Sequence, residues 1–119
     1  MKAEYSATIF HVANVETSLK YYTDILGFTL DFRYNDLAGV VYGSVLIYLS
    51  GPGQDNRRAV GEGSIYIFGD EIDQYYQDII ARGALITVII DNRQYGMRDF
   101  GIRDPDGNNL AFGRESDKE

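Results

Sequence analysis

Residues 103 to 112 read RDPDGNNLAF, a stretch that is typical of two strands joined by a tight turn. Asp104, Pro105 and Gly107 stand at the first, second and fourth turn positions, where a type I turn prefers these residue types. The ring of Pro105 already fixes the backbone angle that the second position requires. The stretch therefore predicts a hairpin in the C-terminal part of the chain.

A second informative stretch, FHVANVETSLKYYTDILGF at 10 to 28, predicts a strand that leads into a helix. Asn14 suits the N-cap, because its side chain can accept a hydrogen bond from an unpaired amide of the first turn. Glu16 complements the helix dipole, and Gly27 is expected to end the helix in the left-handed conformation. Four residues share one helix face: Val15, Leu19, Tyr22 and Leu26.

The second half of the chain repeats this plan, and YYTDIL at 21 to 26 is similar to YYQDII at 75 to 80. A second helix is expected to begin at Asp70 and to end at Arg82 and Gly83, with Ile72, Tyr76, Ile79 and Ile80 on its inner face. Further strands are expected at Phe28–Tyr34, where Leu30, Phe32 and Tyr34 alternate with polar residues, and at Gly39–Gly43, Val45–Leu49, Leu85–Ile90, Met97–Arg103 and Asn108–Phe112.

These stretches, with YGMRDFGIRDPDGNN at 95 to 109, resemble the vicinal-oxygen-chelate superfamily from about Ala7 to Glu115. That family includes glyoxalase I, extradiol dioxygenases, fosfomycin-resistance enzymes and bleomycin-resistance proteins. The resemblance implies an α+β fold, the glyoxalase/bleomycin-resistance fold, in which two βαβββ modules form a curved mixed sheet around a cleft. We expect one domain over 1–119, with module one at 5–50, a Gly- and Pro-containing linker at 51–63 and module two at 64–115.

Composition excludes several classes of function. The net charge is -7, with 18 acidic and 11 basic residues, which disfavours a nucleic-acid partner. The absence of cysteine excludes disulfides and thiolate metal sites. No apolar run approaches the length of a membrane span or a signal sequence, so no membrane partner and a cytoplasmic location are expected. The charged residues at 114–119 are expected to form a frayed tail.

The resemblance places the four metal-binding positions of the family at Ala7, Tyr48, Ser64 and Ala111. Alanine has no donor atom, and neutral tyrosine and serine are poor ligands for the metals that these enzymes use. The sequence therefore predicts no metal and no cofactor. A displaced site made of His11, Glu62 and Glu115 is the alternative, since each lies on the cavity side of its strand.

Aromatic residues stand where the metal ligands are missing. The resemblance implies that the metal-binding positions point into the cleft, and residues two apart on a strand point the same way. We therefore expect one cleft lined by Ile9, His11, Leu46, Tyr48, Tyr66, Phe68 and Asn109. The alternation leaves open whether Asp99 and Arg103 also face the cleft. Flat rings beside a few polar groups suit a planar or cationic ligand.

Within the family, the chain is most similar to the metal-free, bleomycin-resistance-like branch, whose members sequester a cationic aromatic antibiotic unchanged at a dimer interface. This similarity favours a metal-free small-molecule-binding protein that forms a homodimer and performs no catalysis. A glyoxalase- or dioxygenase-type metalloenzyme with a displaced metal site is the alternative, and a subunit with only an interaction role is a third. The branch often has tryptophan in its cleft, and this chain has none, so the sequence does not identify the antibiotic.

Overall fold

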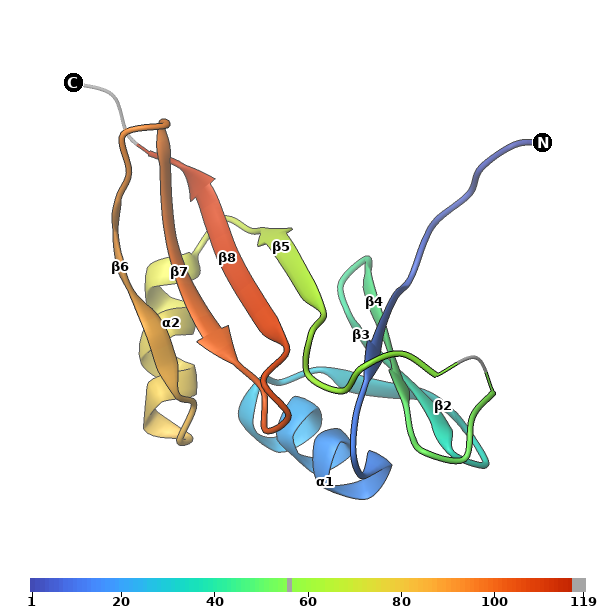
Figure 1. Cartoon of the computed structure of the whole chain (residues 1–119). Helices are drawn as coiled ribbons and strands as arrows, with labels where there is room; N and C mark the ends of the chain where they lie inside the picture. The colour runs from blue at the N-terminus through green and yellow to red at the C-terminus, as the bar shows by residue number, and fades with distance from the viewer. Residues whose placement is uncertain (56, 117–119) are drawn as a thin grey trace.

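The computed structural model describes residues 1–55 and 57–116, which form two modules of like plan (Figure 1). Module one contains β1 (Thr8–His11), α1 (Val15–Lys20), the π-helical turn η1 (Tyr21–Ile25), β2 (Thr29–Tyr34), β3 (Leu37–Tyr42) and β4 (Val45–Ser50). Module two contains β5 (Ser64–Phe68), α2 (Ile72–Ala81), β6 (Ile86–Asn92), β7 (Met97–Arg103) and β8 (Asn109–Glu115). The predicted α+β fold with two βαβββ modules is confirmed.

Each module forms its own four-stranded mixed sheet, with strand orders β1-β4-β3-β2 and β5-β8-β7-β6. The first strand of a module pairs in parallel with the last, and the other pairs are antiparallel. One face of each sheet packs against the helical core, as α2 does behind β6, β7 and β8 in Figure 1. We call the opposite face of each sheet its open face.

The first helix begins as its sequence predicts. The Asn14 side chain caps it by accepting a hydrogen bond from the backbone amide of Thr17 at 2.9 Å. Gly27 follows its end with a φ of 81°, the left-handed conformation that glycine adopts without strain. The π-helical turn was not predicted. It arises where the Leu26 amide donates to the carbonyl of Tyr21, five residues back, at 3.1 Å.

The second helix differs from its prediction in two respects. It begins at Ile72, two residues after the predicted start at Asp70, whose carboxylate instead accepts from the amide of Glu71 at 2.7 Å. The inner face includes the buried Ile72, but Ile80 is 42% exposed, so its placement on that face was wrong. Tyr75 packs against the core in its place.

The strands follow their predictions with shifted ends and one interruption. A bulge in β2 pairs Leu30 with Val40 and Phe32 with Gly39, which breaks the expected alternation between them. The β8 strand continues to Glu115, so the first part of the predicted frayed tail is strand. Residues 117–119 of that tail lie outside the described part of the chain.

The predicted four-residue turn is present, since the Gly107 amide donates to the Asp104 carbonyl at 3.0 Å. The Asp104 side chain is 5% exposed and accepts from the Tyr22 hydroxyl at 2.9 Å and the Asn108 Nδ2 at 3.0 Å. It also accepts from the amides of Asp106 and Asn108, each at 2.9 Å. Because Tyr22 belongs to module one, this carboxylate joins the two modules.

Asp106 strengthens the same junction from the turn. Its carboxylate accepts from the amide of Ala13 at 3.0 Å and from the Ser18 hydroxyl at 3.3 Å, at the start of α1. Buried apolar residues of both modules form one continuous core beneath it, with Phe10, Leu26, Ile47, Phe100 and Leu110 at its centre. The turn at 104–107 therefore holds the two modules together, and we call it the clamp between them.

The linker returns to the junction at its end. The Gly63 amide donates to the Asn108 side-chain oxygen at 2.8 Å, and Asn108 is fully buried. A Cβ at Gly63 would lie 2.4 Å from the Phe10 ring, so the close approach requires glycine. Within the described residues, no helix is long and apolar enough to cross a membrane.

Candidate ligand-binding site

The four positions that correspond to metal ligands lack suitable donors. Tyr48 lies beside Ile9 on β1, Ser64 and Ala111 lie on β5 and β8, and Ala7 directly precedes β1. Two alanines supply no donor atom, and the phenol and hydroxyl that remain come from different modules. This set does not fit a divalent metal.

The displaced set does not converge either. His11 and Glu62 line the same pocket, but Glu115 pairs with Met97 at the other end of β8. Over residues 1–55 and 57–116, no three His, Asp or Glu side chains lie close enough together to hold a metal ion.

A pocket of about 820 Å³ lies on the open face of module one, beneath the linker. We call it the linker pocket, and its lining residues are Ile9, His11, Leu37, Tyr48, Ser50, Gln54, Asp55, Arg58, Ala59, Glu62 and Gly63. Three residues of the predicted cleft, Ile9, His11 and Tyr48, meet here. The Tyr48 ring packs edge-on against Phe32, with ring centroids 5.2 Å apart, which gives the pocket an aromatic wall.

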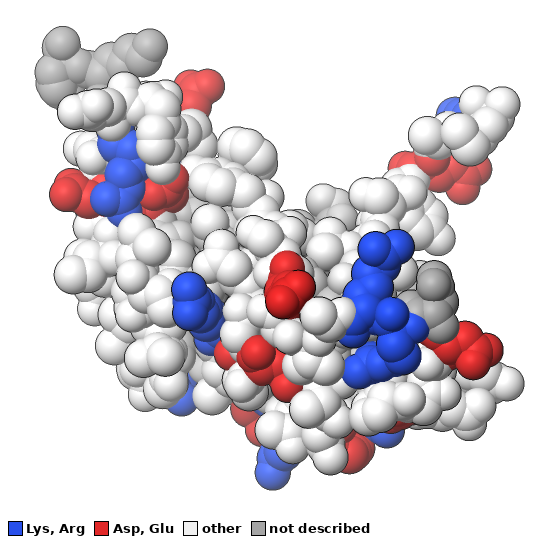
Figure 2. Space-filling view, viewed as in Figure 1, with Lys and Arg blue, Asp and Glu red and all other residues white. Residues whose placement is uncertain are grey.

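Arg57 of the linker holds the linker against module one, beside this pocket. Its guanidinium donates to the carbonyls of Ser50 at 2.7 Å, Gly51 at 2.9 Å and Val12 at 3.3 Å. The same group lies 3.5 Å from the Nδ1 of His11. Figure 2 shows basic side chains gathered over this part of module one.

His11 is neutral at pH 7 because burial, together with the charges of Arg57 and Arg58, lowers its pKa below the ordinary value. An arginine only donates, so Nδ1 is the accepting nitrogen in the contact with Arg57. The remaining ring nitrogen then carries the proton. His11 is thus a hydrogen-bond donor to any group that reaches it in the linker pocket.

The other predicted cleft residues are divided between the two open faces. Leu46 lies two residues before Tyr48 on β4 and points to the same face of the sheet, but it does not line the linker pocket. Tyr66 and Phe68 lie on the open face of module two, with ring centroids 5.0 Å apart, and Phe68 is 73% exposed. Asn109 lies on the same face, where its Nδ2 donates to the Ser64 hydroxyl at 3.4 Å. Within one chain, the seven residues therefore occupy two sheets.

The structure also settles the phase of β7. Asp99 pairs with Gly113 and Arg103 pairs with Asn109, so Asp99 and Arg103 both lie on the open face of module two. The sequence contained this information: Arg103 and Asn109 flank the turn and pair with each other, so their side chains share a face. Asp99 is four residues before Arg103 on the same strand and points the same way.

Asp99 is the centre of a polar group that the sequence did not reveal. Its carboxylate accepts from the Tyr66 hydroxyl at 2.8 Å, the Tyr95 hydroxyl at 2.7 Å and the Arg93 Nε at 2.7 Å. We call these four residues the tyrosine cluster. Only 5% of Asp99 is exposed, whereas 37% of Tyr66 and 68% of Tyr95 are exposed.

The protonation states within the cluster follow from its contacts. Burial works to raise the pKa of Asp99, but hydrogen bonds from Arg93, Tyr95 and Tyr66 hold it below the ordinary value. Burial and the hydrogen bond to Asp99 raise the pKa of Tyr66, and the hydrogen bond to Asp99 raises that of Tyr95. At neutral pH, an ionised carboxylate therefore accepts hydrogen bonds from two neutral phenols.

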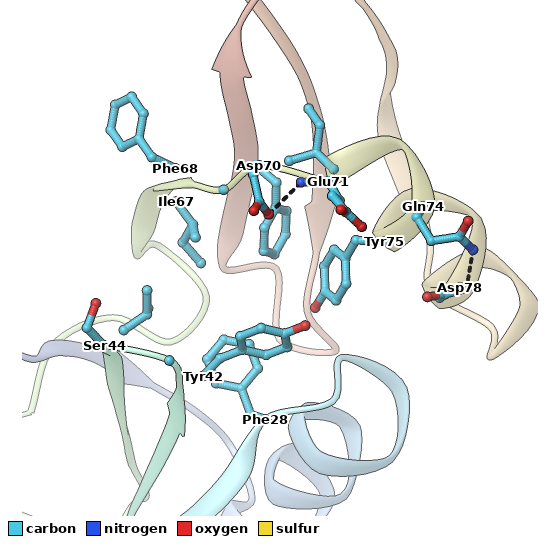
Figure 3. A pocket seen from close by; sticks show the side chains of 15 residues that line it. Phe28, Tyr42, Ser44, Ile67, Phe68, Asp70, Glu71, Gln74, Tyr75 and Asp78 are labelled. Carbon is cyan, nitrogen blue, oxygen red and sulfur yellow. Dashed lines mark hydrogen bonds between the residues drawn. The ribbon is translucent and has the colours of Figure 1, made fainter.

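A second concavity, the intermodule groove, has a volume of about 480 Å³ and lies between the β3–β4 hairpin and the start of α2. Figure 3 shows the rings of Tyr42 and Phe28 on one side of it, with Asp70 and Glu71 on the opposite side. The Tyr75 hydroxyl is tied to the Leu26 carbonyl at 2.5 Å. Of the predicted cleft residues, Phe68 also lines this groove. The sequence analysis placed Phe28, Tyr42, Asp70, Glu71 and Tyr75 in no site.

Comparison with known proteins agrees with this architecture. Residues 6–112 match the sequence profile of the Glyoxalase/Bleomycin resistance protein/Dioxygenase superfamily. A search of curated proteins found no match.

Solved structures share the fold. TioX from Micromonospora sp. ML1 is similar with a TM-score of 0.83 and 15% identity over 96% of this chain and 100% of that one. TnmS3, an antibiotic binding protein from Streptomyces sp. CB03234, has a TM-score of 0.81 and 19% identity over 97% and 98%. A lactoylglutathione lyase from Agrobacterium tumefaciens has a TM-score of 0.77 and 20% identity over 95% and 94%. At these identities the likeness establishes the fold alone.

Proposed function

Because the chain belongs to the glyoxalase/bleomycin resistance protein/dioxygenase superfamily, we propose that it is a metal-free protein that sequesters a small aromatic or cationic antibiotic of bleomycin type. One observation carries the proposal: the positions of the metal ligands hold alanine, serine and tyrosine, while rings occupy the same open faces. Stacking on Tyr48, Tyr66 and Phe68 would contribute about 0.5 to 1.5 kcal/mol for each ring contact.

The linker pocket supports this function by its size and lining. Its volume of about 820 Å³ falls within the range of about 300 to 1,000 Å³ that is usual for small-molecule sites. Its lining combines apolar side chains and the Tyr48 ring with polar and charged groups, among them Asp55, Arg58 and Glu62, which can orient a ligand. The fold similarity to TnmS3, whose description is antibiotic binding protein, points in the same direction.

Purified protein is expected to carry far less than one divalent metal ion per chain, because the available donors do not form a coordination sphere. Elemental analysis after dialysis against a chelator checks this, together with an assay for glyoxalase activity with added nickel or zinc, which should show none. His11→Ala is the control for the displaced site. Near-stoichiometric metal that survives dialysis in the wild type and is lost in His11→Ala would establish the metalloenzyme alternative instead.

A homodimer is the expected assembly. Apolar side chains on or beside the open faces remain uncovered in the single chain, among them Ile9, Phe68, Val88 and Ile89. Contiguous exposed apolar surface marks an interaction site. Pairing module one of one chain with module two of another would cover these residues and bring the divided cleft residues together.

Light scattering at micromolar concentration should therefore give a mass near twice 13.4 kDa. Phe68→Glu is expected to weaken the dimer, because it introduces a charge into the covered surface. Ile80→Glu is the matched control, since Ile80 is an exposed apolar residue on the helical side. A wild-type mass of 13.4 kDa would refute the dimer and leave pairing of the modules within one chain.

A further inference from the structure

The tyrosine cluster presents two phenol oxygens in a fixed orientation. The hydroxyls of Tyr66 and Tyr95 both donate to the same Asp99 oxygen, at 2.8 and 2.7 Å. A phenol has one hydrogen to donate and lone pairs with which it accepts. Since each hydrogen is engaged by Asp99, both oxygens face their remaining surroundings as acceptors.

The ring of Tyr66 is also fixed in place. It lies against β8 at Gly113, where a Cβ would stand 2.0 Å from the phenol oxygen, so a larger residue at 113 would displace the phenol. The exposed part of the ring, together with Phe68 at 5.0 Å, forms an aromatic surface beside the two acceptors. A planar molecule that stacks on this surface would have a phenol oxygen of Tyr66 or Tyr95 beside the edge of its ring system, where it can accept a hydrogen bond.

The hydroxyls of Tyr66 and Tyr95 are not needed to stabilise the β6–β7 hairpin. Arg93 already closes the β6–β7 connection, because its guanidinium donates to the Asp99 carboxylate at 2.7 Å, the Asp99 carbonyl at 3.0 Å and the Ile89 carbonyl at 2.6 Å. Tyr95 is largely exposed, so water could satisfy its hydroxyl without Asp99. Asp99 fixes the orientation of the two phenol hydroxyls. Because each phenol donates to an ionised carboxylate, its oxygen becomes a stronger hydrogen-bond acceptor.

We infer that Tyr66 and Tyr95 recognise a hydrogen-bond donor on a planar ligand, an N–H group of an amine, amidine or amide, and that Asp99 is the positioning residue that fixes both phenols as acceptors. This inference rests on the proposed function and names the ligand chemistry that the open face of module two selects. A carboxylate at the edge of the ligand would face two acceptors and be disfavoured.

Two planar probes of equal ring number test the inference: 9-aminoacridine, which is cationic and carries N–H donors, and anthracene-9-carboxylate, which is anionic. Calorimetry on the intact protein should show tighter binding of 9-aminoacridine. Tyr66→Phe and Tyr95→Phe keep the rings and should each weaken 9-aminoacridine about 3- to 10-fold, the effect of one hydrogen bond. Binding of anthracene-9-carboxylate should not weaken. Tyr76 belongs to α2 and packs on Phe100 at the helical face of the same sheet, so Tyr76→Phe should change neither affinity.

Asp99→Asn tests the positioning role, because an amide can donate to the phenols and so release their hydrogens. The preference for 9-aminoacridine over the carboxylate should shrink in this variant, a change that a loss of stability alone would not cause. An unchanged preference in Tyr66→Phe and Tyr95→Phe, with both probes bound, would overturn this inference and leave the proposed function standing. Failure of both probes to bind the wild type would overturn both.

Discussion

Replacing Asp104 by alanine is expected to lower the free energy of unfolding by about 3 to 5 kcal/mol, at the upper end of single substitutions. The change removes a buried carboxylate that accepts from the Tyr22 hydroxyl, the Asn108 side chain and two backbone amides. Each buried donor left without a partner costs about 1 to 3 kcal/mol. The loss also removes one of the two carboxylates that join module one to the turn of module two.

Urea unfolding followed by circular dichroism measures this effect. Tyr22→Phe removes only one of the four hydrogen bonds and should cost about 1 kcal/mol. Asp31→Ala, at an exposed aspartate of β2, is the control and should change stability by less than about 0.5 kcal/mol. If Asp104→Ala were no more destabilising than Asp31→Ala, the turn would not be the clamp between the modules.

The second large effect is expected in binding. Tyr66→Ala and Tyr48→Ala should each weaken the binding of a planar antibiotic, bleomycin first, by about 1 to 3 kcal/mol, because each removes a stacking ring. Calorimetry measures the loss, and Leu85→Ala, at an exposed apolar residue next to β6, is the control. Higher salt should weaken the binding of a cationic ligand, since the chain carries a net charge of -7. Unchanged affinity in both tyrosine variants would show that other rings hold the ligand.

Local signals were sufficient to predict much of the fold. Asn14 and Gly27 mark the limits of the first helical segment, and the turn at 104–107 has the predicted hydrogen bond. Features that depend on distant contacts were missed. The π-helical turn at 21–25 places Tyr22 against Asp104, and the bulge of β2 accommodates the Phe32 ring over Gly39. Asp104 is distant from Tyr22 in sequence, and Gly39 lies on the strand that follows Phe32, so periodicity within one segment could not reveal either contact.

The candidate site was less predictable for the same reason. The family resemblance, extended by alternation, placed Ile9, His11 and Tyr48 in one cleft, and they do lie together on adjacent parallel strands. It could not show that Tyr66 lies on a separate sheet of the same chain. The tyrosine cluster draws Tyr95 from a hairpin loop, where strand periodicity does not apply. The loop residues of the linker pocket were missed for the same reason.

Sequestration without chemistry is tested most directly by native mass spectrometry of the purified protein after incubation with metal-free bleomycin. The expected spectrum contains the protein with bound bleomycin, and the compound released from the complex has the same mass as the compound added. Absence of any complex, or release of a compound whose mass has changed, would contradict a binding protein that leaves its ligand unaltered.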